Sequence, residues 1–276
     1  MSETHFNNPP ATGSAVERIS AMVLRHWYLL KSSPPRIIDL IYWPTVQLFM
    51  WGFLQTWLAG QSGKLAVAGG SLIGAMLLWD VLFRGQIGFN MSFLEELWSR
   101  NLGHLMVSPL RPHELLIANC VMSILRVMIG LIPVTIMAIY YFGFDLYALG
   151  LWSVAFFFNL MLTGWAIGMF VCGILLRYGL GAEHLAWSLI FILLTLCCVY
   201  YPVSALPSWL QPISLALAPT HVFEGLRSIL IDHEIKPSLM VTASVLNVIY
   251  VSLGIAAFFW FYRDAQRKGT LLSTGE

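Results

Sequence analysis

The sequence predicts an all-α integral membrane protein with six transmembrane helices, an N-terminal interfacial helix and short re-entrant helices before the last span. Hydrophobic residues make up 58% of the chain and charged residues 11%, against about 45–50% and about 25% in soluble domains. Several apolar runs reach the roughly 20 residues that a helix needs to cross the ~30 Å hydrocarbon core of a bilayer. The net charge of +1 gives no electrostatic basis for binding nucleic acid.

The N-terminal region divides into two parts. Residues 1–14 are polar and lack the apolar stretch of a cleaved signal peptide, so we expect a disordered cytoplasmic tail. Residues 15–31 are amphipathic and basic, which favours a helix lying in the membrane interface over an ordinary solvent-exposed helix. The expected apolar face of this helix consists of Val16, Ile19, Val23, Trp27 and Leu30.

A transmembrane domain is expected over residues 15–265, with a second cytoplasmic tail at 266–276. Asp80 and Arg84 are four residues apart, and we expect them to pair where the second span meets water. The segment 202–238 contains five prolines and two apolar runs too short to cross a membrane, which predicts re-entrant or interfacial helices. The six spans are expected at about 37–58, 65–83, 115–142, 149–176, 184–201 and 239–261.

The distribution of Lys and Arg predicts the orientation. Of the 15 Lys and Arg residues, eleven fall in the terminal segments and in the loops on their side, and three fall on the opposite side. Because positive residues are concentrated in cytoplasmic loops, both termini are predicted to be cytoplasmic and the segment 202–238 to lie on the outer face.

A polar stretch at residues 92–114 separates the second and third spans. Its charged side chains would be costly inside the bilayer, so we expect an aqueous loop. Apolar residues recur beside these charges at helical spacing, which predicts a short amphipathic helix over 92–104. Ser92 is the expected N-cap, with Glu95 three residues later completing a capping box.

Two segments resemble the type-2 ABC export permeases. The first has Glu95 and Glu96, then Arg100, and then Ser-Pro-Leu-Arg-Pro-His-Glu-Leu-Leu at 108–116. It is similar to the family's cytoplasmic loop and its entry into the third span. The second, Ala-Pro-Thr-His-Val-Phe-Glu-Gly-Leu-Arg at 218–227, resembles the family's segment before the last span, although many members carry Asn where this chain has Ala.

The resemblance implies a membrane subunit that works as a dimer with a second copy or a homologue. Two copies of a separate cytoplasmic ATPase subunit would bind ATP and Mg²⁺, because this chain has no phosphate-binding loop motif and needs no cofactor of its own. A bacterial inner membrane is the implied location. The residues that the resemblance places at the ATPase contact are Phe93, Leu94, Glu95, Glu96, Leu97, Trp98, Arg100 and His104, with Arg177 and Glu183 from a second loop.

Several residues within or near the spans are candidates for the transport path or its gate. Arg126 is either a buried functional charge, with Asp80, Glu95 or Glu96 as its partner, or a side chain that extends to the cytoplasm. The aromatic residues of the outer half either line a path or belong to the ordinary interfacial belt. The remaining path or gate candidates are Tyr140, Tyr200, Tyr201, Glu224 and Arg227.

The function that the sequence favours is export of an amphipathic or bulky cargo, namely a drug-like molecule, a lipid or a lipid-linked glycan. The alternative is a stand-alone secondary transporter or channel. Against it, the spans contain few charged residues and no convincing internal repeat. The acidic and histidine residues of the polar stretch lack metal-site spacing, and no intramembrane protease motif is present, so a metal centre or an enzyme is not expected.

Overall fold

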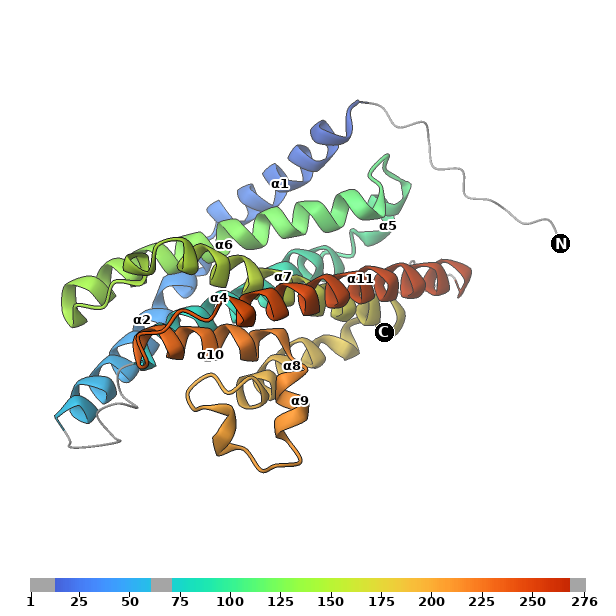
Figure 1. Ribbon diagram of the computed structural model, residues 1–276. Helices are drawn as coiled ribbons and strands as arrows, with labels where there is room; N and C mark the ends of the chain where they lie inside the picture. The colour runs from blue at the N-terminus through green and yellow to red at the C-terminus, as the bar shows by residue number, and fades with distance from the viewer. Residues whose placement is uncertain (1–12, 61–70, 269–276) are drawn as a thin grey trace.

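The computed structural model describes residues 13–60 and 71–268, and this part of the chain is a bundle of helices without a strand (Figure 1). The predicted all-α membrane fold is therefore confirmed. The expected tails lie largely outside the described residues, at 1–12 and 269–276, and so do the expected link between the first two spans and the first residues of the second span.

Five helices of the described chain are long and apolar enough to cross a membrane. They are α2 (Pro34–Ala59), α4 (Leu72–Trp98), α6 (Pro112–Phe142), α7 (Leu151–Tyr178) and α11 (Pro237–Lys268). The expected fifth span is the 14-residue helix α8 (Glu183–Leu196). At 1.5 Å per residue it is about 21 Å long, which is less than the bilayer core, so helix length alone does not establish six spans.

Helix α4 is the centre of the bundle. Its apolar stretch is 89% buried inside the protein, whereas those of α2 and α11 are 17% and 22% buried and leave apolar side chains for lipid. Small residues allow close packing around α4: a Cβ atom on Gly164 of α7 would come within 2.9 Å of the backbone nitrogen of Gln86. Between α7 and α11, Thr163 donates a 2.6 Å hydrogen bond to the buried side chain of Asn247.

The N-terminal helix α1 (Ala15–Lys31) has the predicted bounds, and Ser14 caps it through a capping box with Glu17. Its predicted apolar face is largely confirmed as the face turned inward, because Ile19 and Val23 pack against buried core residues and Leu30 is buried. The buried residues are Met22, His26 and Leu30, and Val16 is 74% exposed. The helix is turned this way because its arginines bind carboxylates of α4 and α6.

The separate amphipathic helix predicted from Ser92 is wrong. α4 continues without a break to Trp98, and the Ser92 hydroxyl donates to the carbonyl of Gly88 rather than capping a new helix. The helix can continue because basic side chains of other helices neutralise its last-turn carboxylates. The short helix of this region is α5 (Leu102–Val107), which follows a turn with Arg100 at φ +52°.

Short helices fill the segment before α11, as predicted. They are the 3-10 turn η3 (Val203–Ala205), α9 (Gln211–Leu215) and α10 (Ala218–Leu230). Val222, Phe223 and Leu226 of α10 are buried in the core. Two further 3-10 turns, η1 (Leu146–Leu149) and η2 (Gly179–Ala182), flank α7.

Candidate functional site

Glu95, on the last turns of α4, is the centre of a buried charge cluster. Its side chain is about one-tenth exposed and accepts a 3.0 Å hydrogen bond from Arg36 of α2. Arg126 of α6 donates to the same carboxylate at 3.2 and 3.3 Å. The buried ring of His26 on α1 lies 3.4 Å from it. One carboxylate thus contacts three other helices.

Glu96, the next residue, binds α1 more directly. It is 1% exposed, and Arg25 binds it with both Nε and a terminal nitrogen, at 2.9 and 3.1 Å. Asn101, in the turn after α4, donates a further hydrogen bond of 2.6 Å. Such two-point contacts between a guanidinium and a carboxylate combine charge with fixed geometry. They hold α1 against the end of α4.

A second two-point pair joins α1 to the first turn of α6. Arg18 donates to the two oxygens of Glu114 at 2.9 and 2.6 Å. Glu114 also accepts from the backbone nitrogen of Arg111 at 2.9 Å. The hydrogen bond to Glu114 raises the pKa of Arg18 above its ordinary value. α1 is therefore attached to both helices that flank the α4–α6 turn.

Next to this buried cluster is an exposed surface. Trp98 is 43% exposed, and Arg100 and His104 are exposed as well. The Trp98 indole donates to Glu183 at 3.2 Å, which joins this turn to the start of α8. The two loops that the sequence assigned to one contact are therefore neighbours in space.

A family model for the ABC-2 type transporter matches residues 18–231, which is most of the chain and includes every member of the charge cluster. The chain belongs to this family. It is therefore a multi-pass membrane permease subunit of an ABC transporter, and its family implies association with an ABC ATPase. No curated protein matches the chain.

The structure of this ABC-2 permease divides the expected ATPase-contact residues into two groups. Phe93, Leu94 and Leu97 are at most 1% exposed, and the carboxylates of Glu95 and Glu96 are bound within the chain. These five side chains therefore face the interior of the chain in the described structure. Trp98, Arg100, His104 and Glu183 form the accessible part.

Arg177, the remaining expected contact residue, is directed elsewhere. Its guanidinium lies 3.5 Å from Asp264 of α11 and over the rings of Tyr178 and Trp260. It therefore holds the C-terminal end of α7 against α11 in the described structure.

The candidate path residues of the permease do not share one set of contacts. Tyr140 is 80% exposed and its ring contacts Tyr141, whereas Tyr200 stacks on Trp51 of α2 with ring centres 4.1 Å apart. Tyr201 donates to the backbone of Thr195. Arg126 is 5% exposed, and its carboxylate partner is Glu95. Of the two expected alternatives, the structure therefore agrees with a buried charge and not with a side chain that extends to the cytoplasm.

Some partners of the charged side chains could not be predicted from the sequence. The pair of Asp80 and Arg84 is confirmed at 2.8 Å, but it is buried within α4 rather than at its end. The roles of Arg18, Arg25 and His26 were missed. The sequence feature that pointed to these residues was the basic face of residues 15–31, which predicted a contact with the membrane interface. In the structure, two arginines of this face bind protein carboxylates instead.

Proposed function

We propose that this permease exports an amphipathic or bulky cargo from the cytoplasm and is driven by a separate ATPase subunit that docks on the surface formed by Trp98, Arg100, His104 and Glu183. The observation that carries the proposal is the position of this surface. It directly adjoins the buried cluster in which Glu95 and Glu96 connect α4 to α1, α2 and α6. A displacement of the α4–α5 turn would therefore be passed to four helices together.

The strength of the cluster supports a rigid transfer of motion. A two-point contact between a guanidinium and a carboxylate resists displacement, because it fixes the geometry as well as the charge. For α1 to separate from α4 and α6, the pairs of Glu96 and Glu114 with its arginines would have to break, and His26 would have to leave Glu95. The central and most buried helix, α4, would carry the movement from the docking turn towards the middle of the bundle.

The proposal includes two ATPase copies and a second permease copy or a homologue, which together would form the path for cargo. ATP and Mg²⁺ would be bound by the ATPase, which supplies the energy of hydrolysis. This chain would contribute docking, transmission and the path itself. Apolar side chains left exposed on α2 and α11 suit contact with lipid or with another permease chain.

The test is isolation of the tagged chain from its native membranes in mild detergent, with mass spectrometry and an ATP-hydrolysis assay on the eluate. The double variant Arg100→Glu/His104→Glu changes exposed side chains only, whereas reversal of Glu95 or Glu96 would also disturb the fold. We expect wild type and the control Trp209→Ala, exposed in the outer segment, to retain an ATPase subunit. The double variant should retain at most about one-tenth as much ATPase subunit, because like charges placed across an interface cost several kcal/mol.

A wild-type chain that elutes alone and without hydrolysis while folded would contradict the proposal. It would favour the alternative of a stand-alone secondary transporter or channel. Equal retention by the double variant and wild type would place the ATPase contact elsewhere on the chain.

A further inference from the structure

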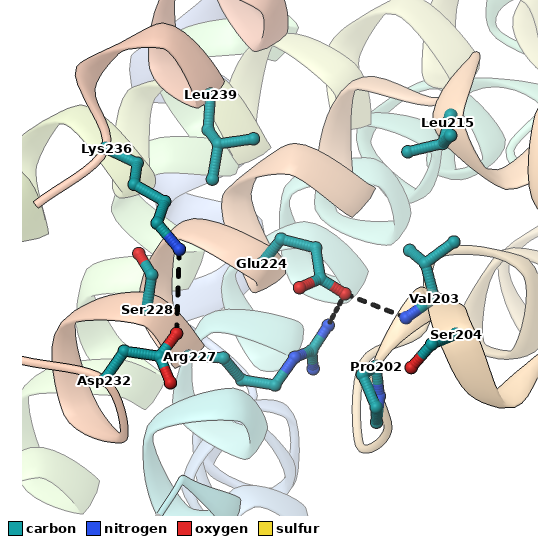
Figure 2. A pocket seen from close by; sticks show the side chains of 10 residues that line it. All are labelled: Pro202, Val203, Ser204, Leu215, Glu224, Arg227, Ser228, Asp232, Lys236 and Leu239. Carbon is teal, nitrogen blue, oxygen red and sulfur yellow. Dashed lines mark hydrogen bonds and ion pairs between the residues drawn. The ribbon is translucent and has the colours of Figure 1, made fainter. Parts of the chain in front are cut away.

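The segment between α8 and α11 lines an open cavity of about 380 Å³ (Figure 2). Leu239, at the start of α11, lies in its wall. The other end of α11 contacts Arg177, close to the α4–α5 turn. The cavity therefore lies at the opposite end of the bundle from the proposed ATPase contact. Its volume falls within the range of small-ligand sites.

One wall of the cavity carries a fixed charged pair. Arg227 donates to the backbone carbonyls of Cys198 and Val199 at 2.9 and 3.2 Å, and to Oε1 of Glu224 at 2.9 Å. The same Oε1 atom accepts from the backbone nitrogen of Val203 at 2.9 Å. The second carboxylate oxygen, Oε2, accepts no hydrogen bond from the described residues. Glu224 is thus held rigidly with one oxygen left for a donor.

The opposite wall carries a loosely held cation. The Lys236 ammonium lies 3.7 Å from Asp232 and 3.5 Å from Glu234, beyond good hydrogen-bond length. These two carboxylates are 54% and 67% exposed, and exposed pairs of this kind contribute little. The ammonium is therefore available to an anion. Figure 2 shows Lys236 on one side of Glu224 and Val203 on the other.

The balance of these charges selects the kind of ligand. Two cations, Arg227 and Lys236, and two anions, Glu224 and Asp232, line the cavity. A ligand with a single charge would be attracted by one wall and repelled by the other. A ligand that carries both a phosphate and an ammonium can place the phosphate at the loosely paired Lys236 and the ammonium at the remaining oxygen of Glu224.

The surroundings of the cavity are apolar. Leu215 and Leu239 lie in its wall. Leu215 is 47% exposed, and Ile235, next to Lys236 in the loop before α11, is 55% exposed. A polar floor with an exposed apolar rim at the end of a transmembrane bundle suits a headgroup that carries acyl chains.

We propose that this cavity binds the phosphoethanolamine headgroup of a phospholipid. The phosphate lies at Lys236, the ammonium donates a hydrogen bond to Oε2 of Glu224, and the acyl chains lie over the rim. A primary ammonium has N–H groups to donate, whereas the trimethylammonium of a choline headgroup has none. The site is separate from the ATPase contact, so its failure would leave the proposed export function untouched.

The test is calorimetric titration of the purified full chain in detergent with dihexanoyl lipids bearing phosphoethanolamine, phosphocholine or phosphoglycerol headgroups, and with free O-phosphoethanolamine. Glu224→Gln retains an oxygen for Val203 and Arg227 but replaces the free oxygen by a donor. Lys236→Met removes the cation and keeps an apolar stem. Asp39→Asn is the control, since Asp39 is an exposed carboxylate of α2 and lies outside the cavity wall.

We expect the phosphoethanolamine lipid to bind the wild type and the control at least about tenfold more tightly than it binds either cavity variant, because each loses a charge-assisted hydrogen bond. It should also bind more tightly than the other two lipids. Equal binding of all three lipids, loss in Lys236→Met alone, or no binding of any lipid would overturn the assignment. Free O-phosphoethanolamine that binds as tightly as the lipid would overturn the role of the acyl chains.

Discussion

At the scale of single residues, Glu95 and Arg126 form a pair whose two members differ in their number of charged partners. Glu95 has two other basic side chains beside it, Arg36 and His26, whereas the only carboxylate that Arg126 contacts in the described structure is Glu95. Arg126 is 5% exposed. Loss of Glu95 would therefore leave a buried cation without compensation, whereas loss of Arg126 would leave the carboxylate still paired.

We expect Glu95→Ala to lower the free energy of unfolding by about 3–5 kcal/mol, and Arg126→Met, which keeps an apolar side chain in place, to lower it by less. The measurement is denaturant unfolding of the purified variants in detergent. The double variant Glu95→Leu/Arg126→Met should regain part of the loss, because the buried cation of Arg126 is no longer left unpaired. A double variant less stable than Glu95→Ala would contradict this account of the pair.

At the scale of helices, the contact between α4 and α7 depends on the absence of a side chain at Gly164. A Cβ there would meet backbone atoms of α4, namely the nitrogen of Gln86 at 2.9 Å, and the carbonyl carbon of Gly85 and the oxygen of Leu82 at 3.2 Å each. Backbone atoms of a packed helix cannot move aside as the end of a flexible side chain can. The two helices would have to separate along their whole contact.

We expect Gly164→Ala to lower the free energy of unfolding by about 1–3 kcal/mol, the usual cost of overpacking. Gly181→Ala is the matched control, because a Cβ at Gly181 would meet nothing within 4 Å. Thermal unfolding in detergent measures both variants. If both unfold at the wild-type temperature, the close α4–α7 contact is not a determinant of stability.

At the scale of the whole molecule, the sequence predicted what depends on local pattern. The bounds of α1, the long apolar helices and the pair of Asp80 and Arg84 all follow from spacings within one helix. The end of α4 could not be predicted this way. Glu96 is tolerated in a continuous helix because Arg25, 71 positions away, binds it. Periodicity carries no information about partners on other helices, so the charge cluster became visible only in three dimensions.

The bundle also gives an argument about topology that does not depend on the length of α8. Arg18 of α1 binds the start of α6, and Asp264 of α11 binds the end of α7. Trp98 at the end of α4 binds Glu183 at the start of α8. All of these contacts lie at one end of the bundle, with α1 and the last turns of α11 (Figure 1). If only five helices crossed the membrane, the termini would have to face opposite sides, in conflict with these contacts.

We therefore expect both termini to be cytoplasmic and the loop before α11 to be external. Green fluorescent protein fluoresces when it folds in the cytoplasm, so it should be bright when fused to either terminus. Alkaline phosphatase is active only outside the cytoplasm, so it should be inactive when fused to either terminus. Phosphatase inserted after Glu234, which is exposed, should be active. Active phosphatase at one terminus and bright fluorescence at the other would show that α8 and the segment after it do not return the chain across the bilayer. The docking surface around Trp98 would then be accessible only if the N-terminal side were the cytoplasmic one.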